Sequence, residues 1–439
     1  MNFERTKRSV EYQPLMNEEL AGYTYEEAMA EANRCIQCKH RPCSEKGCVA
    51  NLPIPEFIKA FRDGDIEEAR RLIDTKSTLT SVCSRVCFQA NQCEGACTLG
   101  IKGESIAIGL LERYIADHSE STYKKNEELH KSVGIIGSGP AGLACAKVLL
   151  SHGVNVDIYE SSELAGGVLR YGIPNYRLPN SITDAYIAEV ETLGGKFILN
   201  SKVALDDIKD KYDAVFMGNG ASIPMTMGAI NEEHEDVLSA FEVLAAINEV
   251  THPKHQEMMN KFNGKVVKVV GGGNVAMDVS RSVARLNPKS VSIVYRRSID
   301  ELPARKEEVE DARIDGVNFE LLINPFEFVI EDNHLVGAKC RQMQLGELDD
   351  SGRRSVSEIP NSEIFIPCDY MIIAIGSSVE KLSEEIATDR RNRIQTSENH
   401  ATNVANVYAG GDAVNGPLTV VHAMRQGKEA AEAMINNWK

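Results

Sequence analysis

The cysteines are the residues whose spacing most clearly suggests chemistry. Eight of the eleven fall between residues 35 and 97. They form two groups of four: Cys35, Cys38, Cys43 and Cys48, then Cys83, Cys87, Cys93 and Cys97. Clustering of this kind in a chain without a secretory signal is more typical of metal binding than of disulfides. Eight closely spaced thiols can supply two tetrahedral sulfur sites.

An electron-carrying centre explains these thiols better than structural zinc does. A zinc ribbon normally uses two Cys-x-x-Cys knuckles, and only Cys35 and Cys38 form one here. Iron–sulfur clusters are held by cysteine thiolates and accept single electrons. Because two nucleotide-binding patterns follow in the same chain, we favour iron–sulfur clusters. Structural zinc and unliganded thiols remain the alternatives.

The first nucleotide-binding pattern is a glycine turn between a short apolar strand (132–136) and a helix. It consists of Gly137, Gly139, Pro140, Ala141 and Gly142. The first glycine permits a tight turn, the second lets the backbone approach a pyrophosphate, and the third allows close packing of helix on strand. The helix N-terminus favours the phosphate charge. Glu160 ends the next strand, where a carboxylate can accept hydrogen bonds from ribose hydroxyls. A turn that serves packing alone is the alternative.

The second pattern follows the strand at 265–270. Its turn and first helical residues include Gly272, Gly273, Asn274, Val275 and Asp278. The next strand ends in Arg296 and Arg297, where the first pattern has an acid. Arginines attract a 2′-phosphate that a carboxylate would repel, so this site favours NADPH over NADH. Two merely solvated arginines are the alternative.

A third element, Gly411-Asp412 after a short strand, resembles the two-dinucleotide-domain flavoprotein reductases. In those proteins the aspartate faces the flavin. The resemblance implies an α/β fold in which a helical iron–sulfur domain (1–127) precedes two Rossmann-like domains. The FAD-binding domain would comprise 128–222 and 366–439. An NADPH-binding domain (223–365) would be inserted into it.

The cysteine spacing and several loops are similar to the small (β) subunit family of NADPH-dependent glutamate synthase. The family includes the large subunit of the electron-bifurcating NADH-dependent ferredoxin:NADP⁺ oxidoreductase, sulfide dehydrogenase and the electron-input half of dihydropyrimidine dehydrogenase. The segments that carry the resemblance are 35–48, 54–58, 83–97, 106–113, 166–174, 176–179, 271–278, 295–298 and 301–305. Further FAD-binding residues implied by it are Gly167, Arg170, Leu178 and Thr419.

The family also implies two [4Fe–4S] clusters with interleaved ligands. One would take Cys35, Cys38, Cys43 and Cys97. The other would take Cys48, Cys87, Cys93 and Glu112. On this mapping Cys83 is a bystander. In the simpler alternative each group of four binds its own cluster, with Cys83 a ligand and Glu112 a surface residue. We expect no catalytic acid or base, because the cofactors carry the reaction.

Composition narrows the partners. The chain has 48 Lys and Arg against 64 Asp and Glu, a net charge of −16. Nucleic acid and anionic membranes need basic patches, so neither is an expected partner. There is no apolar run long enough to span a bilayer and no apolar segment near the N-terminus, so we expect a cytoplasmic protein.

The most favoured function is therefore transfer of electrons between NADP(H), FAD and two [4Fe–4S] clusters to a larger catalytic subunit, as the resemblance to glutamate synthase implies. The alternatives are an electron-bifurcating or sulfide-dehydrogenase subunit with a second flavoprotein partner. A metal-stabilised module that senses nucleotides is a third alternative, from another class.

Overall fold

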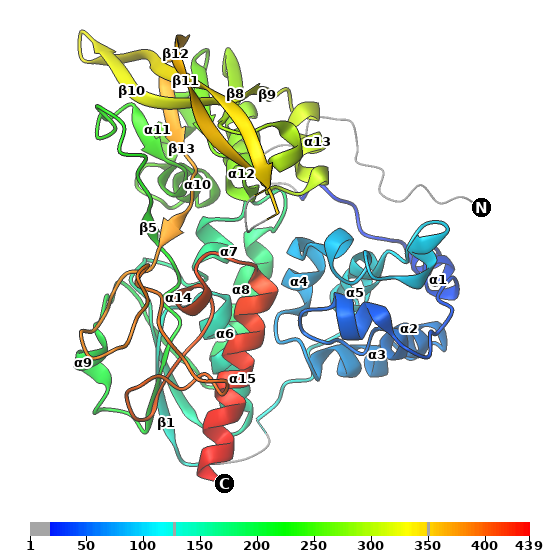
Figure 1. Ribbon diagram of the computed structural model, residues 1–439. Coiled ribbons are helices and arrows are strands. Elements are labelled where there is room, and N and C mark those ends of the chain that lie inside the picture. Colours follow the sequence, from blue (N-terminus) through cyan, green and yellow to red (C-terminus); the bar gives the residue numbers. More distant parts are fainter. Residues whose placement is uncertain (1–17, 126–128, 349–351) are drawn as a thin grey trace.

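The computed structural model describes residues 18–125, 129–348 and 352–439, arranged as a helical domain beside two stacked α/β domains (Figure 1). The helices of the first domain are α1 (Tyr25–Asn33), α2 (Ile54–Arg62), α3 (Ile66–Asp74), α4 (Thr80–Val86) and α5 (Ile108–Asp117). Short turns at Cys43–Gly47, Gln89–Asn91 and Thr98–Ile101 carry the intervening loops.

Local sequence explains where these helices begin. Thr24 caps α1 and forms a reciprocal capping box with Glu27. Asp65 caps α3 by accepting the N–H of Glu68. The apolar faces of the helices then bury Phe57, Ile58, Ile73, Leu111 and Ile115 in one core. The cysteine loops are therefore anchored to a packed helical framework.

The first α/β domain is a parallel sheet in the order β15-β4-β1-β2-β3. Its strands are β1 (Ser132–Ile136), β2 (Asn155–Tyr159), β3 (Lys196–Ile198), β4 (Ala214–Met217) and β15 (Val407–Ala409). Its helices are α6 (Pro140–Ser151), α7 (Val168–Tyr171), α8 (Asn180–Thr192), α9 (Leu205–Ile208), α14 (Asp412–Asn415) and α15 (Val420–Trp438). The strands are apolar runs because parallel sheets are covered on both faces.

The second α/β domain is a parallel sheet in the order β6-β13-β7-β8-β9. Its strands are β6 (Val237–Ser239), β7 (Val266–Val270), β8 (Ser290–Tyr295), β9 (Asn318–Leu321) and β13 (Tyr370–Ile373). Its helices are α10 (Ala240–Asn248), α11 (His255–Lys261), α12 (Asn274–Ala284) and α13 (Lys306–Ile314), with a 3₁₀ turn at Ile299–Glu301.

The expected fold class is confirmed, with one domain boundary corrected. We predicted a return to the first α/β domain at residue 366, but β13 pairs with β7 and β6 in the second sheet. The chain crosses back only afterwards, where β14 (Ser377–Ser378) pairs with the outgoing β5 (Ile223–Pro224). A short buried apolar strand has the same residue pattern in either parallel sheet, so its sequence does not reveal which strands it pairs with.

An antiparallel sheet of β10 (Ile323–Glu331), β11 (His334–Leu348) and β12 (Arg354–Pro367) was not predicted. It lies at the top of the view, beside the second α/β domain (Figure 1). In the part of the chain that the structure describes, no helix combines the length and apolar character needed to cross a bilayer.

Candidate functional site

A cavity of about 360 Å³ opens at the carboxyl ends of β1, β2 and β4, where the first glycine turn lies. Its wall contains the predicted residues Gly137, Gly139, Pro140, Ala141, Glu160, Gly167 and Asp412. A Cβ built on Gly139 meets no atom within 4 Å, so this glycine faces open space. A Cβ on Gly142 lies 2.0 Å from the carbonyl oxygen of Gly137, so the third glycine is needed for packing. The cradle therefore fits a dinucleotide pyrophosphate.

Glu160 is held in place by the glycine turn and by its own loop. Its carboxylate accepts the N–H of Ser138 at 3.2 Å and that of Ser162 at 2.8 Å. The Ser138 hydroxyl donates to the same carboxylate at 2.5 Å, and the glutamate is 6% exposed. This fixes the carboxylate beside the glycine turn, where hydrogen-bonding groups of a ribose can reach it.

Asp412, from the C-terminal part of the chain, lines the same cavity. It accepts the N–H of Leu418 at 3.2 Å, and burial raises the pKa of its carboxyl to about 6. Gly411 precedes it with φ 72°, a left-handed conformation that glycine adopts without strain. The turn thereby brings α14 against the cavity wall formed by the first glycine turn.

The raised pKa of Asp412 predicts a pH-dependent loss of stability in the flavin-free protein. The folded state keeps its proton up to about pH 6, whereas an unfolded aspartate loses it near pH 4. This contribution to stability is therefore greatest at low pH and declines as pH rises through 6. The difference in free energy of unfolding, Asp412→Asn minus wild type, should therefore be about 1 kcal/mol larger at pH 7 than at pH 5. Urea denaturation at both values measures this, and an equal wild-type-to-variant difference at both would contradict it.

Three predicted flavin-side residues do not reach the cavity wall. Arg170 is buried and pairs with Asp184 and, at 3.0 Å, with Glu249 of the second α/β domain. Leu178 is fully buried in the apolar core. The Thr419 hydroxyl lies 2.6 Å from the Nδ1 of His422. The loop at 166–179 instead presents Gly167, Val168 and Tyr171 to the cavity.

In the second glycine turn, two glycines are required by close packing and one faces open space. Gly271 has φ 146°, and a Cβ there would lie 2.3 Å from the Ala374 carbonyl oxygen. A Cβ on Gly272 would collide with Tyr295 and Leu302, whereas one on Gly273 meets nothing within 4 Å. Gly273 is therefore the position open to a ligand. Val275 also lines the 360 Å³ cavity, which joins this turn to the first nucleotide site.

Other predicted residues of the second site have partners within the protein. Asn274 accepts the backbone N–H of Arg305 at 3.1 Å, and buried Asp278 pairs with Arg177 at 2.7 Å. Arg297 is buried and donates to the carbonyl oxygen of Arg354, while Arg296 is exposed. Arg296 is therefore the better placed of the two arginines to bind a mobile 2′-phosphate.

Replacing Arg296 should weaken discrimination between the two nicotinamide nucleotides. A hydrogen bond to a charged group contributes about 1.5–3 kcal/mol. We expect Arg296→Ala to lower kcat/KM for NADPH by about 10- to 100-fold and to leave that for NADH nearly unchanged. Arg313→Ala, at another exposed arginine of the domain, is the control. Steady-state kinetics with both nucleotides provide the measurement. A wild-type preference near one would contradict the assignment.

The cysteines line two small cavities in the helical domain, and the interleaving is visible in both. The first cysteine cavity is lined by Cys35, Cys38, Cys43 and Cys97. The second cysteine cavity is lined by Cys48, Cys83, Cys87, Cys93 and Glu112. Each draws thiols from both sequence groups because the turn after α1 packs against the 87–97 loop. The sets support the interleaved assignment of the first cluster and leave both Cys83 and Glu112 beside the second.

The donor sets suit a polynuclear cluster better than a single ion. Ligands of one zinc ion lie about 2.3 Å from it and hence about 4 Å from one another. Among the described residues, no group of three or more His, Cys, Asp or Glu side chains is placed to hold a metal ion. The thiols instead surround a space, and backbone N–H groups of Leu52 and Ile106 lie 3.4 and 3.5 Å from the sulfurs of Cys48 and Cys97. Hydrogen bonds of this kind tune iron–sulfur clusters.

Glu112 is a buried acid with an unsatisfied carboxyl oxygen. It is 5% exposed, and its Oε1 has no hydrogen-bond partner among the residues that the structure describes. Burial raises the pKa of its carboxyl to about 8. Because an unsatisfied buried carboxyl group is costly, an iron atom that this group could ligate would supply the missing partner.

The three cavities adjoin one another. Ile54 and Ile108 line both cysteine cavities. Val421 and Met424 of α15 line the second cysteine cavity, whereas Ala423, between them in sequence, lines the nucleotide cavity. The first turn of α15 is thus a wall one helix thick between the nucleotide cavity and the cysteines.

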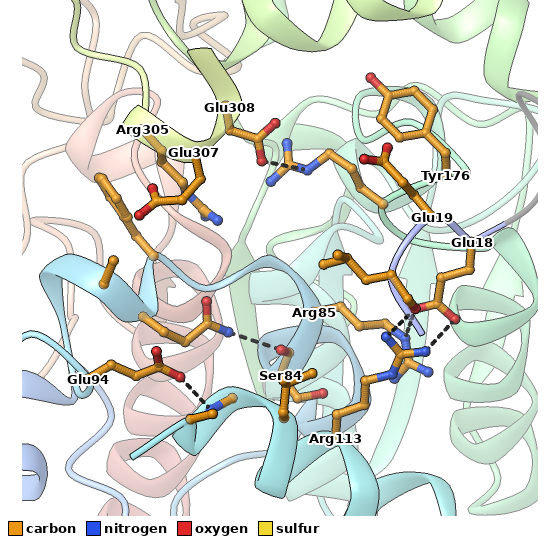
Figure 2. Close-up of a pocket in the computed structure, with 18 of the residues that line it drawn as sticks. Glu18, Glu19, Ser84, Arg85, Glu94, Arg113, Tyr176, Arg305, Glu307 and Glu308 are labelled. Carbon is orange, nitrogen blue, oxygen red and sulfur yellow. Dashed lines mark hydrogen bonds and ion pairs between the residues drawn. The ribbon is translucent and has the colours of Figure 1, made fainter. Parts of the chain in front are cut away.

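A further pocket of about 310 Å³ lies between the helical domain and the second α/β domain (Figure 2). This pocket was not predicted from the sequence, because its charged residues come from segments far apart in the chain. Glu18 pairs with Arg85 at 2.8 Å and Arg113 at 2.9 Å, and Glu19 pairs with Arg281 at 2.6 Å. The Glu19–Arg281 pair joins the two domains, whereas the pairs of Glu18 lie within the helical domain.

Comparisons with known proteins match both halves of the chain. A family described as "Dihydroprymidine dehydrogenase domain II, 4Fe-4S cluster" matches residues 13–124. One described as "Pyridine nucleotide-disulphide oxidoreductase" matches residues 131–427. Mycobacterium tuberculosis FprA in complex with NADPH has a similar fold, with TM-score 0.58 and 19% identity over 70% of this chain and 85% of that chain.

Curated relatives cover more of the chain. The small chain of NADPH glutamate synthase from Escherichia coli (strain K12) is 35% identical over 93% of this chain and 91% of the relative. The beta subunit of NADP⁺-dependent formate dehydrogenase from Moorella thermoacetica is 37% identical over 89% of this chain. This chain spans 59% of that relative and 66% of the putative oxidoreductase AegA from Escherichia coli (strain K12).

Proposed function

Because the chain belongs to the family of NADPH-dependent glutamate synthase small chains, and over residues 131–427 to the pyridine nucleotide-disulphide oxidoreductases, we propose that it is the NADPH-oxidising subunit of a larger enzyme. It takes reducing equivalents from NADPH at one end and delivers single electrons to a partner subunit at the other. The favoured partner is a glutamate synthase large subunit.

The observation that carries this proposal is the row of adjoining cavities. The nucleotide cavity touches Ala423, the second cysteine cavity touches Val421 and Met424, and the two cysteine cavities share Ile54 and Ile108. When bound, FAD accepts a hydride and releases electrons singly, and iron–sulfur clusters carry them one at a time. The row of cavities would hold these groups close enough together for that exchange.

The chain's own residues bind, orient and exclude water. The open positions at Gly139 and Gly273 admit two separate pyrophosphates, and Val275 brings the second site to the edge of the first. Glu160 fixes the ribose end of the first site. The wall of Val421, Ala423 and Met424 is buried, so water is kept out between the nucleotide cavity and the thiols. No side chain is required to move a proton.

The relative named as a glutamate synthase small chain is matched over almost its whole length. This chain accounts for 91% of the small chain of that enzyme but for only 59% of the formate dehydrogenase beta subunit. Its domains are used up by the cofactor sites, so we expect it to need a partner to make glutamate.

The test is turnover of the anaerobically purified chain, loaded with FAD and iron. We expect NADPH oxidation with an artificial one-electron acceptor and no glutamate formation from glutamine and 2-oxoglutarate. Adding the large subunit from the native source should restore glutamate formation. Stoichiometric NADPH binding without oxidation would instead favour a nucleotide sensor. Unaided glutamate synthesis would show the proposal to be incomplete.

A further inference from the structure

The first cysteine cavity lies directly beneath the surface of the protein. Ile36 lies between two of the cysteines, lines the cavity and is 57% exposed. The Cys38 thiol donates to the hydroxyl of Thr98 at 3.3 Å, which joins the two loops that close the cavity. Ile101, at the end of the turn that begins at Thr98, is 77% exposed. Only one layer of side chains therefore separates this cavity from solvent.

Two large exposed apolar side chains at the mouth of a buried site need an explanation. Exposed apolar groups beside a functional site commonly mark a surface that another protein covers. The other walls of the cavity belong to the buried core of the domain, including Ile54, Ile58 and Ile106. In Figure 1, α1 and α2 lie on the side of the helical domain that faces away from both α/β domains. Neither α/β domain, as far as the structure describes them, therefore covers this side.

The charge around the mouth has the opposite sign to that of the whole chain. Lys39 and His40 follow Cys38, Lys102 follows Ile101, and all three are exposed. Within the described residues neither lysine has an ion-pair partner. The nearby acids interact with other cations. Glu45 pairs with Arg41 at 3.6 Å, and the charge of Glu104 stabilises the protonated form of Arg34. A cationic patch on a chain of net charge −16 orients an acidic partner, which the rest of the surface repels.

We define the mouth surface as Ile36, Lys39, His40, Thr98, Ile101 and Lys102. Resting on the proposed function, we propose that the mouth surface docks the electron-accepting partner, and that the partner's matching surface is a ring of carboxylates around an apolar centre. Each NADPH yields NADP⁺, a proton and two electrons. Two one-electron acceptors, docked in succession, are each reduced by one electron, and no bond is formed between the proteins.

The proposal is tested with two redox proteins of opposite charge. The probes are an acidic blue-copper protein and a basic c-type cytochrome, both one-electron acceptors. Lys39→Glu/Lys102→Glu should lower kcat/KM for the acidic acceptor about tenfold at low ionic strength and raise that for the basic one. The wild-type rate with the acidic acceptor should fall as salt is added, because screening weakens the attraction. Lys196→Glu/Lys211→Glu, two exposed lysines of the first α/β domain, is the control and should change neither rate more than about twofold.

A binding measurement separates docking from turnover. The zinc-substituted blue-copper protein cannot accept an electron, so it reports binding alone. Its Kd for the Lys39/Lys102 variant should be about tenfold higher than its Kd for the wild type. NADPH oxidation with a small uncharged quinone should be equal in all three proteins. If it is equal but neither the Kd nor the acidic-acceptor rate responds to the variant, the docking proposal is overturned. If the wild type fails to oxidise NADPH even with the small quinone as acceptor, the proposed function itself fails.

Discussion

Replacing Cys87 by serine should remove about half of the iron, from about eight atoms per chain to about four, while Cys83→Ser should leave it unchanged. Both thiols line the second cysteine cavity, and they lie one helical turn apart, with the N–H of Cys87 donating to the carbonyl oxygen of Cys83. Cys87 ends α4 and begins the loop that carries Cys93, whereas Cys83 lies inside the helix. Glu112 lines the same cavity with an unsatisfied oxygen, so it can complete the set without Cys83.

Iron analysis and electron paramagnetic resonance on anaerobically purified variants measure this effect. The Cys87 variant should keep its flavin and lose electron delivery to large acceptors. Glu112→Ala should lose the same cluster, and Glu112→Cys should retain it. Loss of one cluster in Cys83→Ser, with Glu112→Ala unaffected, would overturn the interleaved assignment in favour of four cysteines of one group.

Gly139→Val should abolish FAD binding without disturbing the fold. Gly139 has φ −71°, which valine tolerates, and a Cβ there has no protein atom within 4 Å. The added side chain therefore occupies only the space through which a pyrophosphate approaches the turn. We expect flavin content to fall by about tenfold or more, with Tm of the flavin-free protein within a few degrees of wild type.

Two matched variants make the result specific. Gly273→Val has the same open surroundings in the second site, and it should keep its flavin while raising KM for NADPH. Gly142→Ala places a Cβ 2.0 Å from a backbone oxygen and should destabilise the whole domain. Absorbance of the flavin and thermal unfolding distinguish the three. Full flavin content in Gly139→Val would show that the cofactor does not lie against this turn.

Local pattern was enough for the parts of the site that depend on backbone. The glycine turns, the acid at the end of β2 and the apolar strands follow from residue type and spacing, and the structure places Gly139 and Gly273 facing open space. The role of Gly142 was predictable because a nearby atom sets it: a Cβ there would meet the carbonyl oxygen of Gly137, five residues earlier.

Side-chain roles set by distant partners were not predictable in this way. Asp278 and Arg170 stand at plausible sequence positions for nucleotide binding, yet they pair with Arg177 and with Glu249, which lie about 80 to 100 residues away in the chain. The pocket of Figure 2 depends on Glu18 and Glu19 in the same way. Whether a charged side chain binds a ligand or pairs with another residue depends on how the domains pack. The spacing of nearby residues in the sequence does not reveal this.

The central claim is that electrons pass from the nucleotide cavity through the α15 wall to the cysteines. Anaerobic mixing of NADPH with iron-loaded wild type and with iron-loaded, flavin-free Gly139→Val, followed by freezing and electron paramagnetic resonance, tests it most directly. We predict signals of reduced clusters in the wild type and none in the variant, although dithionite reduces both. Equally fast reduction of the clusters by NADPH in the flavin-free variant, or no reduction in the wild type, would contradict the account.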